Sequence, residues 1–197
     1  MLEFFIKGLI LNAGLIVAIG AQNAFVLAQG LARRFVGTVA AVCSICDIIL
    51  IAIGIGGGII GKQAATVLTY AGAAYLFWLS AKAAKAAWQG DMLAAAEQLP
   101  QTRTAAIAAA VGLSLLNPHA ILDMTVIFGG ASASLEGNEK LAFAAGGALA
   151  SILWFFGLGL CASKLAPTLS KPIAWRIINA GIAAIMFSIA VSLLFGV

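Results

Sequence analysis

The chain has 197 residues, of which 63% are hydrophobic and only 9% are charged. Soluble domains carry about 25% charged residues, so this composition excludes a soluble globule with a polar surface. The small net charge of +4 gives no indication of a nucleic-acid partner. Long unbroken apolar runs, rather than the alternating pattern of outer-membrane strands, predict an all-α integral membrane protein that lies in the lipid bilayer.

Six apolar runs, each near the roughly 20 residues that cross a bilayer, follow one another along the chain. They span residues 4–28, 37–60, 64–88, 105–131, 141–163 and 173–195. The first run could pass for a signal peptide, but it is longer than the usual apolar core of ~7–15 residues, so we expect a first span. The longest polar break separates three runs from three. It predicts one transmembrane domain with a first repeat over 1–88, a cytoplasmic loop over 89–104 and a second repeat over 105–197.

The positions of Lys and Arg predict the orientation of the chain, because cytoplasmic loops carry an excess of these residues. If the N-terminus lies outside, the cytoplasmic ends of the runs collect eight of the 11 Lys and Arg residues. We therefore expect both the N- and the C-terminus outside.

The two halves show weak similarities that occur in the same order. Asn23 can be set against Asn117, residues 44–54 line up with 148–158, and residues 70–74 line up with 179–183. Three spans per half would place the halves in opposite orientations. The predicted architecture is therefore about six transmembrane helices in two inverted three-helix repeats, with a site at their interface. The alternative is that helices rich in Gly and Ala align by chance.

Two acidic residues lie inside apolar runs. Asp47 is on the order of 15 Å from either end of its predicted helix, too far for its short side chain to reach the interface. It must face a water-filled cavity, meet a partner or stay protonated. Asp123 comes from the other half, and two carboxylates from opposite halves suit a cationic substrate that exchanges with protons. The alternatives are a neutral Asp47 bonded between helices and an Asp123 hydrated near the outer interface.

Polar residues interrupt the first and fourth runs at matching places. Gln22 and Asn23 follow Gly20, and Asn117 precedes Pro118, which cannot donate a backbone hydrogen bond. Such helix breaks expose backbone groups that can bind the amino and carboxylate groups of a substrate. The alternative is a proline kink in which the asparagine satisfies the freed backbone.

Three further residues are weaker candidates for the site. His119 could relay protons, although a lone histidine is more often a hydrogen-bonding contact between helices. Trp154 could form a wall of the site, with helix packing or lipid contact as the favoured alternative. Asn179 begins the aligned segment of the last run.

The chain carries no zinc-protease, serine-hydrolase or phosphate-loop motif, so we expect no enzyme, no cofactor and no metal. Cys43 and Cys46 have C-x-x-C spacing, but they lie in an apolar run without a second dithiol. A membrane thiol-redox carrier would need a cysteine where Asn23 and Asn117 stand. Glycines spaced four apart between positions 54 and 61 suit close helix packing, either within the protomer or in a homodimer.

Together these residues resemble the LysE family of amino-acid exporters, and most closely its lysine/arginine branch. In the first half, the similarity lies in residues 20–27, in the Gln-Gly-Leu and Arg-Arg that follow them, and in Cys46-Asp47. In the second half, it lies in residues 117–123, 153–156 and 175–179. The sequence departs from the family pattern at Ala21, Ser114, Leu115 and Ile121.

The resemblance implies a secondary transporter in a bacterial inner membrane that exports L-lysine or L-arginine by antiport with protons or another cation. Asp47 and Asp123 would exchange the cations, while Gln22, Asn23 and Asn117 with the broken backbone would hold the amino-acid end. An exporter of another small amino acid or metabolite and a passive channel remain alternatives.

Overall fold

The computed structural model describes residues 1–16, 20–57, 62–89, 99–166 and 172–195. Within these ranges the chain forms helices joined by turns, and it contains no strand. In chain order the elements are α1 (Leu2–Ile16), α2 (Ala21–Leu31), α3 (Val36–Ile55), α4 (Lys62–Gln89), α6 (Arg103–Leu115), α7 (Pro118–Leu122), the π-helix η1 (Asp123–Phe128), α8 (Gly129–Ala131), α9 (Gly137–Leu165) and α10 (Pro172–Phe195).

The first apolar run is bent rather than straight. The axes of α1 and α2 meet at 81°. Gly20 precedes α2 in an extended conformation and offers no side-chain cap. The first amide groups of α2, like those of any helix, have no intrahelical partner, and Gly20 has no side chain to accept from them. The bend falls where the sequence places its first group of polar residues.

The fourth run is bent in a corresponding place, and its two parts meet at 65°. Helix α6 ends at Leu115, and α7 begins at Pro118. Proline suits the first position of a helix, because the amide that it lacks would have no intrahelical partner there. The run then widens into η1, and a π-turn of this kind is often found at functional sites.

Two helices, α3 and α9, are each long and apolar enough to cross a membrane, and each bent pair would supply one more span. Helix α10 adds a shorter apolar stretch, Arg176–Val191. Over the described ranges the protein is thus all-helical with two to four candidate spans. The arrangement of six spans in two inverted repeats stays a prediction.

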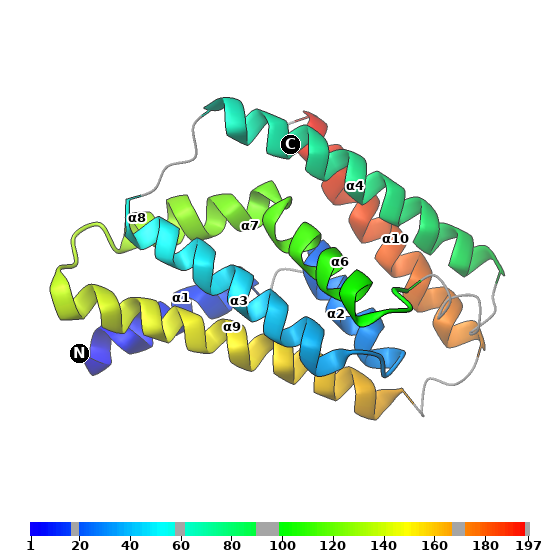
Figure 1. Ribbon diagram of the computed structural model, residues 1–197, viewed down its shortest axis with the longest axis horizontal. Coiled ribbons are helices and arrows are strands. Elements are labelled where there is room, and N and C mark those ends of the chain that lie inside the picture. The colour runs from blue at the N-terminus through cyan, green and yellow to red at the C-terminus, as the bar shows by residue number, and fades with distance from the viewer. Residues whose placement is uncertain (17–19, 58–61, 90–98, 167–171, 196–197) are drawn as a thin grey trace.

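The helices pack in three main pairs, α1 on α9, α3 on α9 and α4 on α10 (Figure 1). Glycines allow the closest of these contacts. A Cβ atom on Gly8 would overlap the carbonyl oxygen of Phe143, and one on Gly146 would overlap that of Phe5. Helices α4 and α10 pack mainly on each other and lie along one side of the molecule (Figure 1).

Candidate functional site

A cavity of about 290 Å³ lies where the two bent runs meet α3. We call it the central cavity. Its wall combines six of the polar or helix-break residues singled out from the sequence with five apolar or small ones: Gly20, Gln22, Asn23, Asp47, Asn117 and Asp123 with Leu15, Ile16, Ala120, Met124 and Ile189. The fold therefore brings residues from both halves of the chain to one place.

Asp47 is the most deeply buried acid of this wall, with only 2% of its surface exposed. One carboxylate oxygen accepts a hydrogen bond of 2.9 Å from the Ser151 hydroxyl of α9. The other accepts a longer one, 3.4 Å, from the side-chain amide of Gln22. A buried carboxylate is stable only where hydrogen-bond donors contact it. Ser151 and Gln22 are these donors, and the carboxylate also lines the central cavity.

The hydrogen bonds of Asp47 continue into a network that joins five helices. The Gln22 amide also donates to the Ser114 hydroxyl in α6, at 2.9 Å. On the other side, the Asn12 amide of α1 donates to the Ser151 hydroxyl at 2.9 Å and to the carbonyl oxygen of Gly147 at 2.6 Å. Movement of any one of these helices would therefore change the surroundings of the carboxylate.

Asn23 ties the two parts of the first run together. Its side-chain amide donates to the carbonyl oxygen of Ile16, the last residue of α1, at 2.7 Å. Its carbonyl oxygen accepts a hydrogen bond of 3.0 Å from the Trp154 indole. The favoured expectation for Trp154 was packing or lipid contact, and the structure gives it this further polar contact.

The remaining sequence candidates divide between the central cavity and other places. Asn117 is buried between α6 and α7, and Asp123 is half-buried at the start of η1. Asn179 lies apart from them, on the wall of a second cavity. The backbones of Pro118 and His119 belong to α7, but their side chains lie outside the described part of the structure.

Sequence reasoning missed three members of the network, Asn12, Ser114 and Ser151. Asn12 carried a signal, because it is a polar residue within an apolar run. Ser151 also carried one, since in the alignment of 44–54 with 148–158 it stands opposite Asp47. Serine is common in membrane helices, where its hydroxyl can donate to its own helix, so Ser114 stood out only as a departure from the family pattern.

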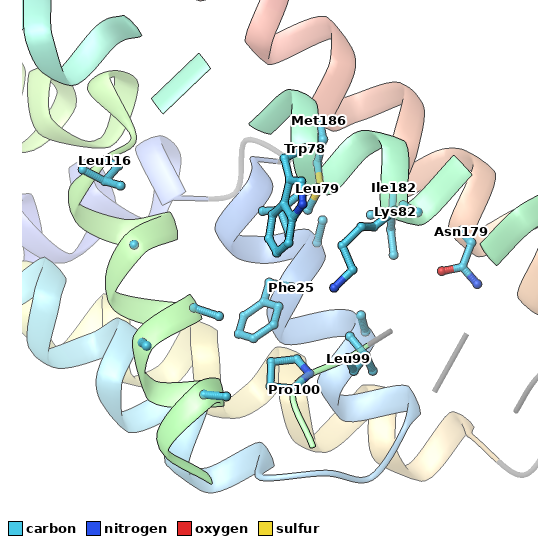
Figure 2. A pocket seen from close by; sticks show the side chains of 17 residues that line it. Phe25, Trp78, Leu79, Lys82, Leu99, Pro100, Leu116, Asn179, Ile182 and Met186 are labelled. Carbon is cyan, nitrogen blue, oxygen red and sulfur yellow. The ribbon is translucent and has the colours of Figure 1, made fainter. Parts of the chain in front are cut away.

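A second, larger cavity of about 600 Å³ separates α2 and α6 from the α4–α10 pair. We call it the lateral cavity. Its wall consists mostly of alanines and large apolar side chains, with Leu99 and Pro100 at one end (Figure 2). No residue pattern predicted this cavity, because small residues in an apolar helix look the same beside a cavity as in a packed core.

The comparisons with known proteins agree on one family. The family model described as LysE type translocator matches residues 13–196. The arginine exporter protein ArgO of Escherichia coli (strain K12) is 40% identical over 98% of this chain and 94% of its own length. The proteins of that name from Pectobacterium carotovorum (strain PC1) and Serratia proteamaculans (strain 568) are each 38% identical over 98% of this chain and 97% of their own. No solved structure matches the chain significantly.

Proposed function

Because the chain belongs to the LysE type translocator family, it is a transporter and not an enzyme, and we propose that it exports L-arginine from the bacterial cytoplasm. L-lysine is the second candidate substrate. The apolar helices and the family indicate a bacterial inner-membrane protein. The observation that carries the proposal is that Asp47 and Asp123, from opposite halves of the chain, line the same cavity.

The proposed coupling is antiport with protons or another cation. Moving one positive charge outward against an inside-negative potential costs about 2.3 kcal/mol per 100 mV, and the entry of one cation in exchange cancels that term. A carboxylate that binds either a proton or the substrate cation performs this exchange. We assign that role to Asp47 and Asp123.

The amino-acid end of the substrate is assigned to the helix breaks. Gly20 leaves the start of α2 without a side-chain cap, and its backbone lines the central cavity. Amides at a helix N-terminus attract a carboxylate, whereas carbonyl oxygens of the backbone or of side-chain amides accept hydrogen bonds from the substrate's ammonium group. Asn23 and Asn117, one from each half of the chain, line the same cavity.

The proposed movement is a rocking of two inverted repeats about the central cavity, which opens it alternately to each side with both termini outside. Two contacts between the halves and one shared bend support the proposed inverted repeats. Asp47 and Ser151, which occupy equivalent positions in the aligned halves, are hydrogen-bonded to each other. Helices α4 and α10, the last helix of each half, pack together, and the first run of each half is bent.

The proposal is tested with purified protein in liposomes loaded with labelled L-arginine, L-lysine or L-leucine. We expect an inward-directed proton gradient to drive the two basic amino acids out, and L-leucine to stay inside. Release into a medium that already contains the same amino acid at a higher concentration distinguishes this transporter from a passive channel. Movement of neither basic amino acid, or movement only down its own gradient, would contradict the proposal.

The Trp154→Phe variant is expected to slow arginine exchange by up to about tenfold. The phenyl ring keeps most of the packing but removes the indole donor that holds the Asn23 amide, and a hydrogen bond of this kind contributes about 0.5–1.5 kcal/mol. Initial rates of exchange in liposomes measure the effect. Trp88→Phe is the matched control, because Trp88 is 85% exposed at the end of α4. Equal rates for both variants would show that the Trp154 contact has no part in transport.

A further inference from the structure

The hydroxyl of Ser151 does not make the hydrogen bond that a serine within a helix usually makes. Such a hydroxyl commonly donates to the carbonyl oxygen four residues earlier in its own helix. Three other serines of this chain do so at 2.8 Å each: Ser44, Ser114 and Ser188. Ser151 donates instead to the Asp47 carboxylate of α3, at 2.9 Å. The acceptor expected from its own helix, the carbonyl oxygen of Gly147, is therefore not the one that it uses.

Asn12 of α1 occupies that expected acceptor. Its side-chain amide donates one hydrogen to the Gly147 carbonyl oxygen at 2.6 Å and the other to the Ser151 hydroxyl at 2.9 Å. The Gly147 oxygen also accepts the helical hydrogen bond from the backbone amide of Ser151, so both of its lone pairs are used. Because the Ser151 oxygen accepts from Asn12, its single hydrogen is left to point at Asp47.

The contact between α1 and α9 is built for this short side chain. Gly8, one turn before Asn12, meets the α9 backbone so closely that a Cβ atom would overlap it, and the same holds for Gly146 against α1. Asn12 and Ser151 are both fully buried. The Oδ1 atom of Asn12 has no hydrogen-bond partner among the described residues. A buried polar atom without a partner is costly, so packing alone would favour an apolar residue at this position.

We propose that Asn12 is a positioning residue of the cation-exchange site, which turns the Ser151 hydroxyl onto Asp47 while α1 is packed on α9. The proposal rests on the proposed function, in which Asp47 exchanges a proton for the substrate cation. A donor that points at the carboxylate stabilises its charged form. If α1 moves away from α9, the hydroxyl can turn back to Gly147, and the carboxylate loses that support. Asn12 thereby links the position of the first helix to the charge of Asp47.

The pH dependence of exchange reports on this link, because the carboxylate must be charged to bind a cation. Among the described side chains, the ionisable groups on the elements around Asp47 are Asp123 of η1 and the Cys43 and Cys46 thiols of its own helix. Thiols stay neutral below about pH 8. Helix α2 has no ionisable side chain, and those of α1, α6 and α9 lie near the helix ends. The imidazole of His119, in α7, lies outside the described structure. The comparison of variants isolates Asp47 from these other groups, because Ser151 donates to Asp47 alone.

The test measures exchange of labelled arginine in liposomes with the same pH on both sides, over a series of pH values. Asn12→Leu keeps the approximate size of the side chain but removes both amide hydrogens. We expect the pH of half-maximal exchange to rise by about one unit or more, as loss of a hydrogen bond to a charged group implies. At higher pH the rate should approach that of the wild type. Ser151→Ala should give a similar shift, and the double variant no larger one, because Asn12 acts through Ser151.

Asn138→Leu is the matched control, because Asn138 is exposed near the start of α9, and it should leave the pH profile as it is. If Asn12→Leu does not fold, Asn12→Ala makes the same comparison. A variant that is slower by the same factor at every pH, an unchanged profile, or shifts that add in the double variant would overturn the positioning role alone. So would a wild type whose arginine exchange does not depend on pH. A wild type that exchanges no basic amino acid would overturn the proposed function, and the positioning role with it.

Discussion

Replacing Asp47 with asparagine is expected to reduce arginine exchange by about tenfold to a hundredfold while the protein still folds. Both carboxylate oxygens of Asp47 accept hydrogen bonds, from Ser151 and from Gln22. An asparagine amide can accept with one end only, so its NH₂ group would face a donor. Hydrogen bonds to charged groups are worth about 1.5–3 kcal/mol, and each 1.4 kcal/mol corresponds to about a factor of ten. The charge proposed to exchange cations is lost as well.

Exchange of labelled arginine across liposomes, with equal amounts of inserted protein, measures this effect. Ser44→Ala is the matched control. Ser44 is buried on the same helix, and its hydroxyl donates to the carbonyl oxygen of Ala40 in the preceding turn. Its loss should leave exchange close to that of the wild type. If the Asp47→Asn variant exchanged arginine as fast as the wild type, the carboxylate would have no role in coupling.

Adding a single methyl group at Gly129 is expected to destabilise the protein and to impair transport. A Cβ atom there would lie 2.7 Å from the carbonyl oxygen of Gly54 in α3, which is closer than such atoms approach in proteins. Both partners are backbone, so neither can turn aside as a flexible side chain would. Overpacking of this kind costs about 1–3 kcal/mol. The contact also joins the helix that carries Asp47 to the segment that carries Asp123.

The neighbouring glycine supplies the control, because a Cβ atom on Gly130 would meet no atom within 4 Å. Thermal unfolding in detergent and arginine exchange are measured for Gly129→Ala and Gly130→Ala together. Only the first should unfold at a lower temperature and transport more slowly. Equal behaviour of the two variants would show that α3 and α8 can separate without cost.

The residues around the central cavity could be selected from the sequence because polar groups in an apolar run are costly. Asp47 and Asp123 are the clearest examples, and Gln22, Asn23 and Asn117 mark the two bends. Their placement around one cavity is a finding of the structure, while their roles in transport stay predictions. Costly residues leave a signal because they persist only where something in the fold or the function requires them.

Other parts of the site left no such signal. Whether Ser151 would meet Asp47 depended on how α9 packs against α3, and single residues do not specify the packing of two distant helices. In the sequence, Lys82 is only one of the positive charges from which the orientation of the spans is predicted. Its position over Trp78 on a cavity wall depends on the space between α4 and α6, which the sequence does not show.

The hydrogen bond from Ser151 to Asp47 limits how symmetric the two halves can be. In a freshly duplicated chain both positions would carry the same residue. Two aspartates would bring like charges together in a poorly hydrated interior, and one of them would have to take up a proton. Two serines would leave Asp123 as the only acid on the cavity wall described here. One acid and one hydroxyl keep a single carboxylate at this contact, so the two proposed repeats would be unequal partners that could not be interchanged.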